Sequence, residues 1–197
     1  LIKADLRFPE QIISMFDELE REFGLPEILV NNSGVFPDEI HATEIDENLW
    51  DETFDVNLKA VFFTSKEFVK RAETGSRIIV IASLGSYEVW KGRLPYNVSK
   101  AAVLRLTEAL ARDLAPDFTV NAVCPGGIYM PKNDQNFRKD AQEKKSDDLY
   151  FSSDKIPMRR FASVADVFDA VYFFTEASSY ITGQSIVVDG GHGLVKS

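Results

Sequence analysis

The segment Tyr96-Asn-Val-Ser-Lys100 places a phenol and an amine four residues apart. On a helix, positions i and i+4 lie on the same face, with Cβ atoms about 5–6 Å apart. A neighbouring ammonium stabilises a phenolate, and lowering a phenol's pKa from about 10 to about 7 takes roughly 4 kcal/mol. The pair can therefore exchange a proton near neutral pH. Taken alone, a Tyr-x-x-x-Lys pattern is most often a surface contact between a ring and a cation. The residues around it must therefore distinguish a catalytic pair from a surface pair.

Polar residues and glycines follow several predicted strands at the point where each strand ends. Ser83 ends one apolar run, and Asn31-Asn-Ser-Gly34 and Pro125-Gly-Gly-Ile128 follow two others. The carboxyl ends of parallel strands form the ligand-binding edge of an open α/β sheet. Gly34 lets a ligand approach the backbone closely. Asn57 is a further candidate because a polar side chain on an apolar helix face needs a partner.

The elements that position these residues alternate between apolar runs and helical patterns, which predicts an α/β fold with a parallel sheet covered by helices. Apolar runs without alternation are typical of strands buried on both faces. No repeat or linker interrupts the pattern, so one domain is expected over residues 1–197. The predicted strands are Ile28–Asn32, Arg77–Ser83, Phe118–Pro125 and Ser185–Asp189; the predicted helices run from Pro9 to Gly24, Asp46–Arg71, Pro95–Leu114 and onward from the capping box Ser163-Val-Ala-Asp166.

The composition narrows the class of protein. The 197 residues carry a net charge of −9, which argues against a protein that binds nucleic acid by neutralising phosphates. The single cysteine, Cys124, excludes an internal disulfide and is expected in the core. Two histidines far apart do not indicate a zinc site. No apolar run reaches the roughly 20 residues of a membrane helix, and no signal-peptide pattern is present, which favours the cytoplasm.

In their order and spacing, these motifs resemble the short-chain dehydrogenase/reductase family from Asp5 to Gly191. The resemblance implies a Rossmann-like, doubly wound parallel sheet. It also implies an NAD(P)-dependent oxidoreductase that interconverts a secondary alcohol and a ketone by hydride transfer. The matching motifs are Asn31-Asn-Ser-Gly34, Asn57, Ser83, Tyr96 with Lys100, Pro125-Gly126, and Tyr180-Ile-Thr-Gly-Gln184 leading into Val188-Asp-Gly-Gly191.

The resemblance implies a role for each matching residue. Tyr96 would be the general acid in reduction and the general base in oxidation, with Lys100 lowering its pKa and binding the nicotinamide ribose. Ser83 would orient the carbonyl, and Asn57 would hold a water in a proton relay. No metal is implied. The implied coenzyme-binding residues are Asp5, Leu6, Asn32, Ser33, Gly34, Tyr96, Lys100, Pro125, Gly126 and Ile128.

Two positions depart from the family pattern. Met130 stands where the family has a Thr or Ser whose hydroxyl helps to hold the coenzyme carboxamide, and Met cannot form that hydrogen bond. Ser33 replaces an alanine, which is a small change. Between Met130 and Met158, the charged segment 138–148 is either a solvated surface segment or a lid over a substrate site.

The family's first two strands and helices, with their glycine-rich turn, have no counterpart in this sequence. We therefore expect no helix N-terminus to cradle a coenzyme pyrophosphate, and we expect Ile28–Asn32 to be an uncovered edge strand. Two explanations are open: a piece of a longer enzyme, or a catalytically silent subunit that folds only with a complete partner. The presence of Asn57, Ser83, Tyr96 and Lys100 together favours the first.

The expected substrate is a small carbonyl or alcohol compound, and both a 3-oxoacyl thioester reductase and a sugar or polyol dehydrogenase remain open. Phe62, Phe63 and Phe68 cover more than one face of the Asp46–Arg71 helix. In the family, this helix and Pro95–Leu114 pair across a four-helix interface. A homodimer or homotetramer is therefore expected.

Without the glycine-rich turn, the 197 residues alone are expected to turn over NAD(P)H slowly or not at all, because the pyrophosphate lacks its binding turn. Loss of NAD(P)H absorbance with a panel of ketones measures this. Sustained turnover by the 197-residue chain would refute the expectation.

Overall fold

The computed structural model describes residues 1–129 and 152–194, so Met130 and the charged segment 138–148 lie outside the described residues. Four strands form one parallel sheet in chain order. The strands are β1 (Ile28–Asn31), β2 (Arg77–Ile81), β3 (Thr119–Pro125) and β4 (Ser185–Val188); the main helices are α1 (Pro9–Phe23), α2 (Glu47–Phe54), α3 (Ala60–Val69), α4 (Leu94–Leu114) and α6 (Val164–Glu176). The predicted α/β fold is confirmed, and each strand ends within two residues of its predicted bounds.

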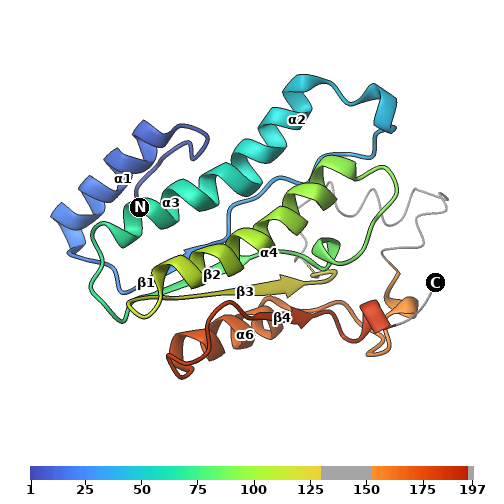
Figure 1. The fold of residues 1–197 in the computed structure, drawn as a ribbon. Helices are drawn as coiled ribbons and strands as arrows, with labels where there is room; N and C mark the ends of the chain where they lie inside the picture. The colour runs from blue at the N-terminus through green and yellow to red at the C-terminus, as the bar shows by residue number, and fades with distance from the viewer. Residues whose placement is uncertain (130–151, 195–197) are drawn as a thin grey trace.

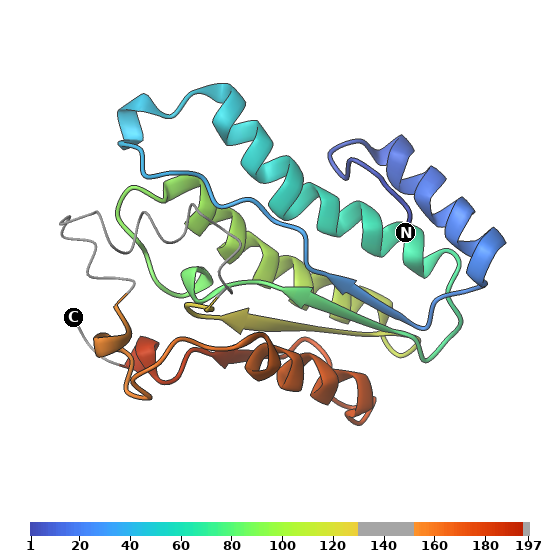
Figure 2. The same cartoon turned by 180° about the vertical axis from the view of Figure 1, so that it is seen from behind.

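Helices cover both faces of the sheet: α1, α3 and α4 lie on one side and α6 on the other (Figures 1 and 2). Alternate strand residues separate the two cores, since Ile78 and Val80 pack with α1, α3 and α4 whereas Ile79 packs with α6. Cys124 is fully buried in the larger core, as expected. Among the described residues, none of the helices combines the length and apolarity that a membrane span requires.

The strand β1 is one edge of this sheet, and β4 is the other. In the described residues β1 pairs with β2, and the opening segment 1–6 forms no strand. Ile28 is 43% exposed and Val30 is 42% exposed, which confirms the expected uncovered edge. Burial on both faces, which the apolar run suggested, is confirmed for β2 and β3 but not for β1, because nothing described covers the outer side of β1.

The predicted Asp46–Arg71 helix is not one regular α-helix. Asp46 caps its start by accepting the Leu49 N–H at 2.8 Å. A π-helical turn, Asp55–Lys59, then separates α2 from α3. This turn was not predicted, because an apolar stripe at helical spacing does not reveal one extra residue per turn. The capping box Ser163–Asp166 at the start of α6 is confirmed, with both of its hydrogen bonds present.

Phe68 of α3 is fully buried and packs edge-on against Phe118, with ring centroids 6.4 Å apart. We expect Phe68→Ala to lower the free energy of unfolding by about 3–5 kcal/mol, since the truncation leaves a cavity. Urea denaturation measures the loss. Phe62→Ala is the control: Phe62 is on the same helix but 40% exposed, so its loss should be much smaller. Equal losses for the two variants would contradict this packing.

Candidate active site

The parallel register of β1, β2 and β3 brings their carboxyl ends to one edge of the sheet. Asn31 of β1 lies opposite Val80 of β2, and Val80 lies opposite Ala122 of β3. The residues that follow each strand therefore leave from the same side, as the strand arrows in Figure 1 show. This confirms that the turns after the predicted strands share one edge.

Asn57 connects this edge to two helices. The side-chain amide accepts the Val35 N–H at 2.8 Å and donates to the Val35 carbonyl at 3.0 Å. Its nitrogen also donates to the Ser99 hydroxyl of α4 at 3.0 Å. Asn57 is fully buried and lies in the middle of the π-helical turn, so the wider turn carries the side chain that joins the strand-end loop to α4.

Lys100 lies beside Gly34 and Asn57. A Cβ on Gly34 would lie 3.2 Å from Asn57 Oδ1 and 3.5 Å from Lys100 Nζ, so the loop packs closely because it has no side chain there. The Lys100 amine donates to the Ile81 carbonyl at 3.0 Å and is almost completely buried. Burial disfavours the ammonium and lowers the pKa of Lys100 to about 8.

The Ser83 side chain lies close enough to the Tyr96 phenol to lower its pKa as a hydrogen-bonding neighbour. Ser83 Oγ also accepts the Gly85 N–H at 3.0 Å. Burial raises the pKa of Tyr96, and the Ser83 hydrogen bond offsets part of that rise. Desolvation of the phenolate dominates the pKa of Tyr96, and the Lys100 amine donates to the Ile81 carbonyl, so the lowering of the Tyr96 pKa by Lys100 stays a prediction.

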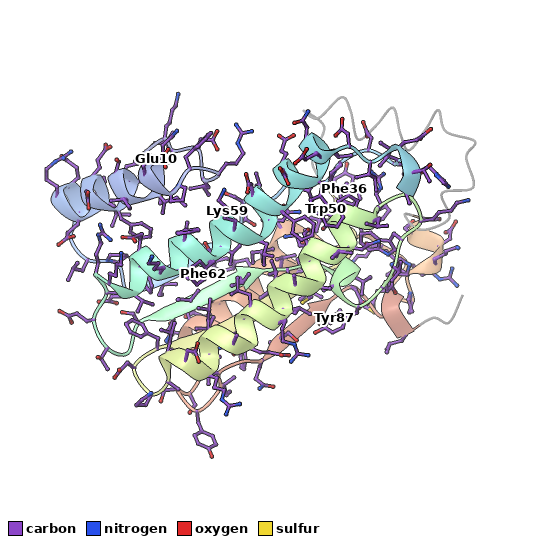
Figure 3. All side chains as sticks on the ribbon, turned by 45° about the horizontal axis from the view of Figure 1, so that its top comes forward. Glu10, Phe36, Trp50, Lys59, Phe62 and Tyr87 are labelled. Atoms are coloured by element: carbon purple, nitrogen blue, oxygen red, sulfur yellow. The ribbon has the colours of Figure 1, made fainter. Side chains whose placement is uncertain are left out.

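Two aromatic residues around Tyr96 were missed by the sequence reasoning. Phe36 meets the Tyr96 ring edge-on at 4.6 Å, and Trp90 lies parallel to it at 6.1 Å. Figure 3 shows Phe36 near the start of α4. The sequence does hold one indication of this role: Phe36 comes two residues after Gly34, in a loop that follows a strand. Such loops lie at the ligand-binding edge of the sheet.

Asp5, Leu6 and Ser33 line one open hollow of about 640 Å³, so the structure brings together three of the residues expected to bind coenzyme. The Asp5 carboxylate accepts from Arg7 Nη2 at 2.6 Å, and this contact lowers the pKa of Asp5. Asn32, Ser33 and Gly34 are exposed at this rim. A surface hollow beside exposed backbone and a charged carboxylate fits the adenosine part of a dinucleotide.

The Pro125–Ile128 turn reaches the same edge from β3. A Cβ on Gly126 would lie 2.9 Å from Asp189 Cβ and 3.7 Å from Leu84, the residue after Ser83. The Gly127 carbonyl accepts the Ala162 N–H at 2.9 Å. Glycine is thus required for the turn to pass close to the end of β4.

A larger hollow of about 820 Å³ lies nearby, between the segments 39–44 and 85–92 and the first turns of α4. None of Asn57, Ser83, Tyr96 and Lys100 lines it. Gly85, which does line it, lies against the Tyr96 ring, since a Cβ there would be 3.2 Å from Tyr96 Cε1.

The fold and the site define an α/β protein with a tyrosine, a lysine and a serine near the carboxyl edge of a parallel sheet. A family model described as Enoyl-(Acyl carrier protein) reductase matches residues 1–193. The 2-dehydro-3-deoxy-D-gluconate 5-dehydrogenase of Escherichia coli is 36% identical, over 96% of this chain and 74% of that protein. The 3-oxoacyl-(acyl-carrier-protein) reductase FabG of Staphylococcus epidermidis is 33% identical, over 96% of this chain and 76% of that protein.

The structure of Thermoplasma acidophilum aldohexose dehydrogenase superposes with a TM-score of 0.87 at 30% identity, covering 99% of this chain and 78% of that one. The chain therefore belongs to the short-chain dehydrogenase/reductase family. Its fold is Rossmann-like, and it is an oxidoreductase of a family that uses NAD(P).

The buried Lys100 gives the folded state a defined pH dependence. Its pKa is about 8 in the folded chain against the ordinary 10.5, so between these values the unfolded chain binds more protons at Lys100. Stability of the wild type relative to Lys100→Met should therefore rise by about 1–2 kcal/mol from pH about 7.5 to about 9.5. Urea denaturation at several pH values measures it. A difference that stays flat or falls would show that Lys100 is not buried as the structure has it.

Proposed function

We propose that the site at the carboxyl edge interconverts a secondary alcohol and a ketone by hydride transfer, with Tyr96 as the general acid and base. The observation that carries the proposal is that the Tyr96 phenol lies beside the buried Ser83 side chain and one helical turn from the buried Lys100. Family membership supports an NAD(P)-dependent reaction, in which bound NAD(P) supplies or accepts the hydride.

Ser83 would orient the substrate carbonyl. Its Oγ already accepts the Gly85 N–H, which leaves its O–H free to donate toward a carbonyl oxygen or toward Tyr96. In reduction, the Tyr96 phenol gives its proton to the carbonyl oxygen, and its raised pKa keeps that proton in place at neutral pH. In oxidation, the phenolate takes the alcohol proton.

Lys100 would stabilise that phenolate. With a pKa of about 8, Lys100 is mostly charged at neutral pH, and a positive charge near the phenolate favours its formation. Asn57 would hold the Val35 loop against α4 through Ser99. The water relay through Asn57 and the ribose contact of Lys100 stay predictions.

The coenzyme would lie along the strand ends, with Asp5 and Leu6 at its adenosine part. The shared hollow of Asp5, Leu6 and Ser33 supports this placement. The remaining residues of the proposed coenzyme site are Asn32, Gly34, Tyr96, Lys100, Pro125, Gly126 and Ile128.

The relatives carry the names of a sugar-acid dehydrogenase, an aldohexose dehydrogenase and an oxoacyl-carrier reductase. The proposal is therefore made for a secondary alcohol or ketone of small-molecule size. These names support an enzyme and give no support to a catalytically silent subunit. We also propose a cytoplasmic homodimer or homotetramer; the half-exposed Phe62 of α3 and Val98 of α4 support an interface there.

Tyr96→Phe removes the proton donor while keeping the ring, so it should reduce kcat by about 10²–10⁴-fold, the usual contribution of general acid–base catalysis. The measurement is NAD(P)-linked turnover by the protein, with the coenzyme Kd followed by fluorescence and expected to change little.

Tyr87→Phe is the matched control, because Tyr87 is more than half exposed and its hydroxyl forms a hydrogen bond with Ser185, away from Tyr96. It should keep full turnover. If Tyr96→Phe retained wild-type kcat, Tyr96 would not be the proton-transfer group.

A further inference from the structure

Arg93, three residues before Tyr96, holds the loop that follows β1 at three points. Its guanidinium carbon lies 4.3 Å from the centre of the Phe36 ring. Nη1 donates to the Pro37 carbonyl, and Nη2 lies 3.8 Å from a Glu39 carboxylate oxygen. The Arg93 side chain is only 12% exposed, so these contacts are made largely away from water.

Phe36 in turn contacts the Tyr96 ring. The two rings meet nearly perpendicular, at 87°, with centroids 4.6 Å apart. Phe36 also meets Trp90 edge-on at 6.3 Å, while Trp90 lies parallel to Tyr96 at 14°. The Tyr96 ring is therefore bounded by one ring at its face and another approaching perpendicular to it, which restricts its rotation.

Burial alone does not explain why Phe36 keeps this position. The side chain is 46% exposed, so the hydrophobic effect holds it only in part. The Arg93 guanidinium lies over the ring, and the Arg93 Nε is buried with no hydrogen-bond partner in the described residues. An unpaired buried N–H raises the free energy of the folded chain. The Arg93 guanidinium nevertheless keeps its position over the ring, so its attraction to the Phe36 ring offsets part of that cost.

We propose that Arg93 and Phe36 are positioning residues for Tyr96: Arg93 holds Phe36 against the phenol ring, and this contact keeps the ring in one packed position beside Ser83. The effect on turnover rests on the proposed function, whereas the effect on the ring is a property of the folded chain. Arginine suits this place because its planar group stacks on a ring and donates to a carbonyl at the same time, which lysine cannot do.

The direct test is the rate at which the Tyr96 ring flips, measured by NMR on ring-labelled tyrosine, with the Tyr96 signals assigned by their loss in Tyr96→Phe. Phe36→Leu and Arg93→Met should each accelerate flipping by about tenfold or more, since every tenfold corresponds to about 1.4 kcal/mol of barrier. Arg93→Lys keeps the charge but loses the planar contact, and it should also accelerate flipping. Phe36→Tyr keeps an aromatic ring at this position, so Tyr96 should flip at the slow wild-type rate.

Phe168→Leu is the matched control, since Phe168 is a more than half-exposed ring stacked on Tyr172 of α6, on the other face of the sheet. It should leave Tyr96 flipping unchanged. Urea denaturation of each variant separates local loosening from global unfolding. The proposal is overturned if the Tyr96 ring flips at the wild-type rate in Phe36→Leu, or if it flips faster than the wild type in Phe36→Tyr.

Arg93→Met should also lower kcat about tenfold, because a loosely packed Tyr96 ring lies beside the substrate carbonyl for a smaller fraction of the time, while KM for the coenzyme changes little. If Arg93→Met accelerates flipping of the Tyr96 ring but leaves kcat unchanged, the link between this contact and turnover is overturned. If Tyr96→Phe itself stays active while ring flipping responds as expected, the proposed function fails and the positioning contact stands. The two failures are therefore distinguishable.

Discussion

The hydrogen bonds of the Asn57 amide are the contacts on which the site depends. They join the Val35 backbone, in the loop after β1, to Ser99 on α4, one residue before Lys100. Because Asn57 is fully buried, losing these bonds would leave polar groups unpaired in the interior, which costs more than the bonds themselves contribute. The π-helical turn makes the contact possible, since a widened turn points one additional side chain toward the sheet edge.

Desolvation sets the charge balance around these bonds. The same burial lowers the pKa of Lys100 and raises the pKa of Tyr96, because both neutral forms are favoured away from water. A phenol that keeps its proton is suited to donate it, whereas forming the phenolate requires compensation by a nearby positive charge. Phe36 and Trp90 contribute to this environment by covering the Tyr96 ring. The aromatic contacts thus affect both the direction of the phenol and its acidity.

Local pattern predicted much of this structure. The apolar runs of β2 and β3, Pro9 at the start of α1 and the Ser163–Asp166 capping box each depend on neighbours within a few residues, and each is found as expected. The apolar run predicted burial of β1 on both faces, but Ile28 and Val30 are nearly half exposed. Burial depends on which elements pack against the strand, and the run itself does not specify them. The contact of Arg93 with Phe36 was not predicted, since these residues are far apart in the chain and meet where the loop after β1 lies against the residue that precedes α4.

The sequence by itself determined the fold class, the strand order along the chain, and which residue types could transfer a proton: Tyr96, Lys100 and Ser83. These follow from residue periodicity and from the chemistry of single side chains. The tertiary structure alone decided which of them touch, and in which protonation state they are favoured. Ser83 reaches Tyr96, whereas Lys100 donates to the Ile81 carbonyl. The physical reason is that hydrogen-bond partners and desolvation are set by packing between distant segments, and no local pattern encodes them.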